Sequence, residues 1–282
     1  MQLSVVIITF NEEANIGRTL AGVQPLVADG KGEIIVIDSG STDRTVEIAK
    51  SHGANVFIED WKGYAAQKNS AIDKSSGEWI LSLDADEELT DELCKALNLA
   101  LVFMRDKALT NSDGEWLHNL VGVRDPDGIV GFRIWRRNFF LGKPLRWGGY
   151  FPDPKLRMVR KKVARFELRS VHEDIAIPAG SIAEIWSPIL HHSYPTLSEY
   201  IDHMNRYSSL GAEMVVAKGR VRFSFINIVL RPLFTFIYNY FFRLGFLDGH
   251  EGLLLHLYHA VYVSWKYSKA WELSRQKTNL SS

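Results

Sequence analysis

The sequence predicts an α/β fold in which a mostly parallel sheet is flanked by helices. Short apolar, β-branched runs are typical of strands buried on both faces of such a sheet, and four occur in the first part of the chain: 3–8, 34–37, 56–58 and 79–83. Helical stretches separate them, at about 14–27, 44–51 and 64–74. Strands alternating with helices imply right-handed crossovers between parallel neighbours.

Polar residues follow three of these runs. Thr9-Phe10-Asn11-Glu12 follows the first, Asp38-Ser39-Gly40-Ser41 the second and Asp84-Ala85-Asp86 the fourth. Ligands of parallel sheets bind at the carboxyl ends of the strands, so these clusters are expected at one edge. Residues i and i+2 of an extended segment point the same way, so Asp84 and Asp86 are expected to converge on one cation. Mg²⁺ and Mn²⁺ prefer such oxygen ligands and keep positions open for phosphate.

The acidic residues also have structural interpretations. Asp84 and Asp86 can form a solvated strand end before a helix that opens near Thr90. A carboxylate such as Asp38 accepts hydrogen bonds from the donor edge of a base. It can equally cap a turn through Ser39 and Ser41.

Three motifs in this order resemble family 2 glycosyltransferases of the GT-A fold: 5–12, 37–45 and 83–86. The resemblance implies a nucleotide-sugar donor, usually UDP-linked, whose nucleoside is lined by Thr9, Asn11 and Glu12. It implies that Asp38, together with Ser39, receives the base. It also implies that Asp84 and Asp86 flank the metal and the diphosphate.

Lys68 lies in the helical stretch 63–71, where family members often carry a basic residue facing the nucleotide. A lysine can serve as a point charge for phosphate. A solvated helix face is the alternative for Lys68.

Further stretches resemble a bacterial subgroup of this family that acts in lipopolysaccharide core biosynthesis, usually as glucosyltransferases: 131–138, 140–143, 147–153, 155–160, 170–174, 189–192, 205–208 and 244–249. The likeness therefore covers nearly the whole chain. It implies inverting transfer of a hexose, in which one carboxylate removes the acceptor proton while a metal takes up charge on the departing diphosphate.

The catalytic base that removes the acceptor proton is expected among His172, Glu173 and Asp174. The resemblance favours Glu173 first and Asp174 second, and packing or pocket lining is the stronger interpretation of His172. A late histidine reaches back to the metal or diphosphate in many GT-A enzymes, and the resemblance puts His192 there, with His191 less favoured.

The composition of the chain indicates the cellular compartment in which the protein is expected. The single cysteine, Cys94, excludes a disulfide framework and predicts a reducing compartment. The net charge of zero argues against a general nucleic-acid surface. The first apolar run is a core strand and not a signal peptide, so a cytoplasmic protein is expected.

Two parts are predicted, a GT-A domain at 1–195 and a helical extension at 196–282. The domain comprises a nucleotide-sugar half at about 1–105 and an acceptor half at about 129–195, separated by a loop-rich excursion at 106–128. The extension contains an aromatic-rich run, 223–247, that charged residues interrupt too often for a membrane span. With its flanking arginines it suits a helix lying in the headgroup region at the inner membrane, and a buried hairpin or homodimer interface is the alternative.

The predicted function is metal-dependent transfer of a hexose, which the resemblance implies to be glucose from a UDP-linked donor, to a bacterial surface glycan such as lipopolysaccharide core. Polyprenyl phosphate or another glycan is the alternative acceptor. A nucleotidyltransferase would share the sheet and Mg²⁺, but it is expected to have a glycine-rich, basic loop after the first strand, where this chain has Asn11-Glu12-Glu13. A nucleotide-sugar-binding protein without catalysis is the third interpretation.

Overall fold

The computed structural model describes residues 2–106, 128–167, 175, 177, 181–219 and 221–280. The chain forms two compact units, one comprising Met1–Arg136 with Asp153–His191, and the other Arg137–Pro152 with His192–Ser282. The predicted division at 195 lies close to the break between His191 and His192. Residues 137–152, however, join the second unit, because Phe140 and Leu145 are buried in its core beside Tyr200 and Leu255.

The described strands form a mixed sheet in the order β3-β2-β1-β4-β8-β6-β9-β5, with β7 paired to β6. The first four in this order are parallel, and β8 pairs antiparallel with both β4 and β6. The strands are β1 (Leu3–Thr9), β2 (Gly32–Asp38), β3 (Asn55–Ile58), β4 (Trp79–Asp84), β5 (Glu87–Glu88), β6 (Ile129–Phe140), β7 (Lys143–Pro144), β8 (Asp153–Arg160) and β9 (Ser181–Tyr194). The α/β prediction is confirmed, with the parallel region at the N-terminal strands.

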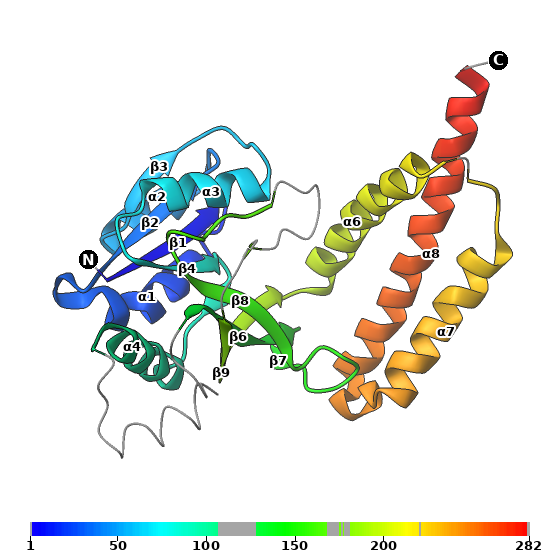
Figure 1. Ribbon diagram of the computed structural model, residues 1–282. Helices are drawn as coiled ribbons and strands as arrows, with labels where there is room; N and C mark the ends of the chain where they lie inside the picture. The colour runs from blue at the N-terminus through cyan, green and yellow to red at the C-terminus, as the bar shows by residue number, and fades with distance from the viewer. Residues whose placement is uncertain are drawn as a thin grey trace. The chain divides into compact units, whose positions relative to one another are not determined.

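Helices cover both faces of the parallel strands (Figure 1). Alternate strand residues face opposite sides, so Val5 and Ile7 pack with α1 and α4, whereas Val6 packs with α3. The helices of this unit are α1 (Ile16–Val27), the short η1 (Ala28–Gly30), α2 (Thr45–Ser51), α3 (Tyr64–Lys74) and α4 (Asp91–Asp106). Their bounds match the predicted helices to within two residues wherever a range was predicted.

Strand register places the polar clusters at one edge. Thr9 pairs with Asp38 in β2, and Ile8 pairs with Asp84 in β4. The three carboxyl ends therefore lie side by side, as the strand order predicts.

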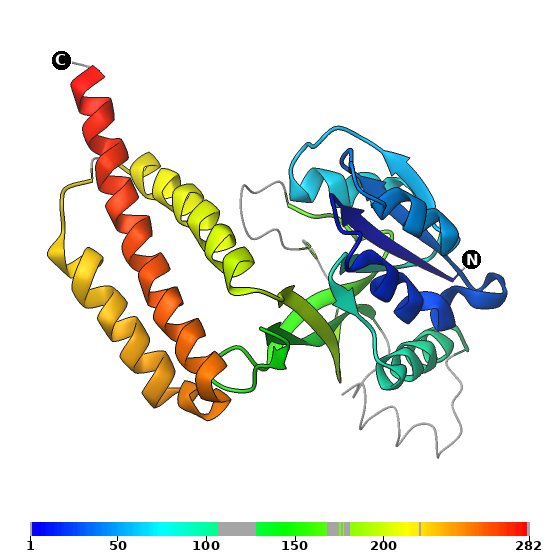
Figure 2. The ribbon, with the colours of Figure 1, turned by 180° about the vertical axis from the view of Figure 1, so that it is seen from behind.

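The second unit is mainly helical (Figures 1 and 2). Two segments, α6 and α7, pack against a long α8. The elements are α6 (Leu197–Ala217), η2 (Ile226–Leu230), α7 (Arg231–Ile237), η3 (Tyr238–Phe242), η4 (Gly245–Asp248) and α8 (Gly249–Leu280). In the described residues, no helix combines the length and the apolar character that crossing a membrane requires.

Arg231 interrupts the apolar character of the aromatic-rich run, and the chain stays helical across it from Phe225 to Phe242. Pro232 is the second residue of α7 and directly follows the π-helical segment η2, so the missing N–H of this proline falls where the helix changes from wider turns to α-helical turns. The last helix, α8, spans Gly249–Leu280 and includes the apolar stretch 252–265.

His256 of α8 is buried where two loops of the second unit meet. Its ring fills space that a Cβ atom would need at Gly148 or Gly245, which would lie 2.1 and 2.2 Å from its Nε2 atom. Neither ring nitrogen has a hydrogen-bond partner among the described residues. Burial, with the nearby His259, lowers the pKa of His256 to about 4.

This burial predicts acid sensitivity. The unfolded chain takes up a proton near pH 6.5 and the folded chain only near pH 4, so the free energy of unfolding falls as the pH falls between these values. We expect a loss of about 2 kcal/mol between pH 7 and pH 5 from this residue. Urea denaturation at both pH values measures it.

The matched variants are His256→Phe and His250→Phe, the second at an exposed position of the same helix. His256→Phe should lessen the pH dependence, whereas His250→Phe should retain it. Equal pH dependence in wild type and His256→Phe would contradict the assignment.

Candidate functional site

The loops after β1 and β2 are held together by side-chain hydrogen bonds. The backbone N–H of Asn11 donates to Ser41 Oγ at 2.8 Å, and the backbone N–H of Thr42 donates to the side-chain Oδ1 of Asn11 at 2.8 Å. Glu12 N–H donates to Thr45 Oγ1 at 2.7 Å. Asn11 adopts a φ of 54°, a left-handed conformation that asparagine tolerates better than most residues. Asn11 and Glu12 thus shape this edge, whatever they contact in a ligand.

Asp38 is fully buried at the end of β2 and organises its own loop. Its Oδ1 accepts hydrogen bonds from Gly40 N–H at 3.0 Å and Ser41 N–H at 2.8 Å, and its Oδ2 accepts one from Ser41 Oγ at 2.5 Å. The turn-capping interpretation of Asp38 therefore describes real contacts. A carboxylate has about four acceptor positions, so capping leaves capacity for one more donor.

Two buried polar atoms beside Asp38 lack partners within the described part of the chain: Thr9 Oγ1 and Gln67 Oε1. Gln67 lies on α3, and its amide nitrogen donates to Ser39 Oγ at 3.1 Å. An unsatisfied buried polar group is costly, so such atoms indicate a missing ligand or water. Gln67, which the sequence did not single out, thus contacts Ser39, whose backbone N–H donates to the Thr9 carbonyl oxygen at 2.9 Å.

Asp84, at the end of β4, is held by two buried cations. Lys68 Nζ lies 2.9 Å from its Oδ1, and Arg157 Nη2 lies 2.7 Å from its Oδ2. Burial raises the pKa of Asp84, but the charges of Arg157 and Lys68 outweigh that effect and hold the pKa well below its usual range. Lys68 does not lie on a solvated helix face. Its Nζ is also 5.3 Å from the centre of the Phe166 ring.

Glu87 is fully buried and connects this ion pair to the backbone. Its Oε2 accepts the Asp84 N–H at 3.0 Å, and its Oε1 contacts Arg157 and, at 3.6 Å, Arg136. Arg136 in turn donates to Asp153 Oδ2 at 2.8 Å. The network therefore fixes Arg157 between two carboxylates.

Asp86 does not continue the strand, because β4 ends at Asp84 and residues 85 and 86 form a turn. The expectation that Asp84 and Asp86 share one extended segment is therefore wrong, and each carboxylate contacts different partners. Asp86 Oδ2 lies 3.3 Å from His191 Nε2. Burial and the charge of Asp84 raise the pKa of Asp86, but His191 outweighs them and lowers it.

His191, less favoured from the sequence, is the histidine that reaches Asp86, because β5 pairs Glu87 with His191. His192 belongs to the second unit, where its ring stacks on Phe139 with centres 4.7 Å apart. Within the described ranges, no three side chains of His, Cys, Asp or Glu gather as a metal cluster.

The family model described as "Glycosyl transferase family 2" matches residues 4–165, more than half of the chain. The chain belongs to glycosyltransferase family 2. Within the family it is similar to the lipopolysaccharide core biosynthesis glycosyltransferase LpsC of Rhizobium meliloti, with 31% identity over 96% of this chain and 93% of LpsC. An uncharacterized glycosyltransferase of Rickettsia typhi is 27% identical over 99% of this chain and 90% of its own.

The fold is that of GT-A glycosyltransferases. The mannosyltransferase PcManGT from Pyrobaculum calidifontis, solved with GDP-Man and Mn²⁺, matches with a TM-score of 0.50 at 15% identity, over 99% of this chain and 87% of that one. Identity at this level is evidence for the fold alone.

In this family 2 glycosyltransferase, the base candidates Glu173 and Asp174, with His172, lie outside the described residues, as does most of the excursion at 106–128. Arg157, Arg136 and Glu87 were missed as site residues. Alternation within strand β8 gives only a weak signal for Arg157, since a buried arginine is uncommon and its partners are distant in sequence.

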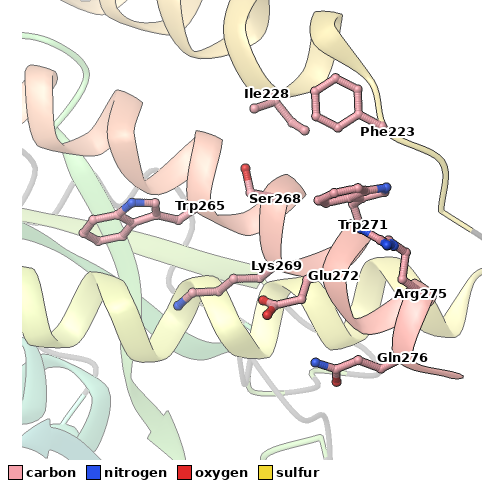
Figure 3. A pocket seen from close by; sticks show the side chains of 9 residues that line it. All are labelled: Phe223, Ile228, Trp265, Ser268, Lys269, Trp271, Glu272, Arg275 and Gln276. Atoms are coloured by element: carbon pink, nitrogen blue, oxygen red, sulfur yellow. The ribbon is translucent and has the colours of Figure 1, made fainter. Parts of the chain in front are cut away.

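A groove of about 470 Å³ lies in the second unit of this glycosyltransferase (Figure 3). Phe223, Trp265 and Trp271 line it together with Lys269, Glu272 and Arg275. It contains none of the residues at the strand ends, and its one carboxylate, Glu272, lies beside Lys269. The groove is therefore not the candidate donor site.

The buried network yields a stability prediction. Glu87→Gln removes a charge that faces Arg157 while keeping the side-chain size, and among the described residues Arg157 then retains only Asp84 as a carboxylate partner. Breaking a buried ion pair lowers the free energy of unfolding by about 3–5 kcal/mol. Because Asp84 still neutralises Arg157 in this variant, we expect a loss near the lower end of that range. Urea denaturation at neutral pH measures the loss.

Glu47→Gln is the matched control, because Glu47 makes the same kind of contact to Arg44 at an exposed position. Exposed pairs contribute little, so its unfolding midpoint should stay close to that of wild type. Equal behaviour of the two variants would show that Glu87 contributes nothing beyond a surface pair.

Proposed function

We propose that this protein transfers a hexose from a UDP-sugar to a bacterial surface glycan such as the lipopolysaccharide core. We propose glucose as the hexose, and inversion of configuration at its anomeric carbon. The observation that carries the proposal is the strand-end cluster of Asp38, Asp84 and Asp86 beside the buried cations Lys68 and Arg157. Family membership and the likeness to LpsC support transfer to a glycan.

The nucleoside is assigned to the space beside Asp38. The remaining acceptor position of Asp38 suits the N–H edge of uracil. The unpartnered Thr9 Oγ1 and Gln67 Oε1 offer further hydrogen bonds to a nucleoside. Asn11, Glu12 and Ser39 keep the two loops in the arrangement that forms this space.

The diphosphate is assigned to the neighbourhood of Asp84. Lys68 and Arg157 exchange part of their contact with Asp84 for phosphate oxygens, which accept from the same donors. Glu87 and Arg136 hold Arg157 in place during this exchange. The leaving diphosphate is thereby stabilised by charges already fixed in the folded protein.

A divalent cation, Mg²⁺ or Mn²⁺, fits the residues present. Asp86 is partly exposed and kept ionised, and His191 stands 3.3 Å from it, so the two would hold the cation while the donor supplies phosphate oxygens. His192 remains a second candidate. The cation supplies charge neutralisation on the departing diphosphate. PcManGT, of the same fold, was solved with Mn²⁺.

The acceptor hydroxyl loses its proton to a carboxylate, for which Glu173 is the first candidate and Asp174 the second. A positioned base takes this proton as the bond to the anomeric carbon forms. Attack on the face opposite the diphosphate gives the inverted product.

The test is a thermal-shift screen of UDP-, GDP- and ADP-sugars with Mn²⁺, followed by a transfer assay with deacylated core oligosaccharide. We expect stabilisation by a UDP-hexose and a product whose anomeric configuration, read by NMR, is opposite to that of the donor. Retention of configuration would overturn the mechanism. Transfer to polyprenyl phosphate in place of the oligosaccharide would overturn the acceptor.

A further inference from the structure

The helical run from Phe225 to Phe242 exposes a stripe of large apolar side chains. The exposed residues come in adjacent pairs repeated every four positions: Phe225 and Ile226, Val229 and Leu230, Leu233 and Phe234, Ile237 and Tyr238, Phe241 and Phe242. All ten stand among the exposed large hydrophobic residues of the chain. Contiguous apolar surface of this extent is rare on a free soluble surface and marks an interaction site.

The two π-helical segments keep this stripe on one face. In an α-helix of 3.6 residues per turn, a four-residue repeat advances by roughly 40° beyond each full turn, so the stripe would wind around the axis. The wider π turns at Ile226–Leu230 and Tyr238–Phe242 offset that drift. The intervening residues other than Arg231, including Ile228 and Phe236, are more buried.

The charged residues within the stripe and next to it in the sequence are all positive. From Met214 to Leu247 the sequence has no Asp or Glu, and it has five cations: Lys218, Arg220, Arg222, Arg231 and Arg243. Arg222 and Arg243 are exposed just before and just after the stripe. Arg231 lies over the Tyr267 ring, 5.1 Å from its centre.

We propose that this stripe docks in the interfacial region of an anionic lipid bilayer, lying in the membrane plane. Apolar and aromatic side chains enter the boundary between headgroups and acyl chains, and the flanking arginines meet anionic headgroups. A second copy of the chain is a poorer occupant, because pairing two such faces would bring Arg222, Arg231 and Arg243 of both copies together, and the run itself carries no acid to compensate them. No described helix suits a span, which agrees with an in-plane position.

The groove beside Phe223 adjoins the start of the stripe. Phe223 and Trp271 meet edge to face with ring centres 5.4 Å apart, and the Arg275 guanidinium lies 5.0 Å from the Trp271 ring (Figure 3). Aromatic rings with an adjacent cation are the composition expected of side chains at a headgroup boundary. The groove thus extends the same chemistry toward α8.

The test is flotation of the full-length protein with vesicles of phosphatidylcholine alone and of phosphatidylcholine mixed with phosphatidylglycerol. We expect binding to the anionic vesicles, reduced only in part by high salt because the apolar contacts are not screened. Ile226→Glu should lower the partition coefficient roughly tenfold or more, because one buried isoleucine side chain contributes about that much.

Ile58→Glu is the matched control. Ile58 is 67% exposed in the first unit and Ile226 is 64% exposed in the stripe, so both variants place a new charge on an already exposed isoleucine. Ile58→Glu should leave vesicle binding unchanged. Circular dichroism checks that both variants are folded, and no step depends on sugar transfer.

Three results would overturn the proposal. The first is a full-length protein that does not float with anionic vesicles at low salt, and the second is equal loss of binding in the two variants. A stable dimer that Ile226→Glu dissociates, seen by sedimentation velocity in the absence of lipid, would also assign the stripe to a second copy and overturn the lipid assignment.

Discussion

Asp86→Ala is expected to abolish sugar transfer and to remove the metal dependence of UDP binding. Asp86 is partly exposed, its pKa is lowered by His191, and its carboxylate makes one ion-pair contact, so its loss should cost little folding stability. Isothermal titration of UDP with and without Mn²⁺ measures the binding, and product formation measures the transfer. The stabilising effect of Mn²⁺ on UDP binding should disappear in the variant.

Asp73→Ala is the control for this experiment, because Asp73 makes a comparable ion pair with Arg165 on an exposed surface. It should retain both transfer and metal dependence. Full activity of Asp86→Ala, or full activity of wild type in EDTA, would remove the metal from the mechanism. His191→Asn and His192→Asn then separate the two histidines, and the contact with Asp86 predicts the larger loss of metal affinity for His191→Asn.

Glu173→Gln is expected to lower turnover by roughly 10²- to 10⁴-fold, the usual contribution of a positioned acid or base. Glutamine keeps the size of the side chain but cannot accept the acceptor proton. Donor affinity should stay near that of wild type, because the base contacts the acceptor and not the nucleotide. Steady-state kinetics with UDP-hexose, together with titration of UDP, separates the two effects.

The adjacent residue supplies the control. Asp174→Asn should reduce turnover less than Glu173→Gln does. The reverse order would move the base by one residue along the chain, and wild-type turnover in both variants would place it outside this segment.

The sequence was informative wherever the signal was local. Continuous apolar runs predicted the four parallel strands, and polar residues at their ends predicted that Thr9, Asp38 and Asp84 meet at one edge, because parallel strands end together. Helices α1, α2 and α3 were predicted by patterns confined to a dozen residues. Motif order also indicated the family, which the match over residues 4–165 confirms.

Contacts between distant residues required the tertiary structure. Arg157 reaches Asp84 and Glu87 only because β8 pairs antiparallel with β4, and no local pattern encodes that pairing. His191 reaches Asp86 because β9 pairs with β5, whereas sequence spacing treats His191 and His192 alike.

The sequence by itself determined the α/β class, the gathering of polar strand ends at one edge and the family, because each depends on neighbouring residues. The tertiary structure decided which cations neutralise Asp84, which histidine meets Asp86 and which aromatic side chains stay exposed on the second unit. Those outcomes depend on strand pairing and on the π turns of one helix, which arise from packing among distant segments.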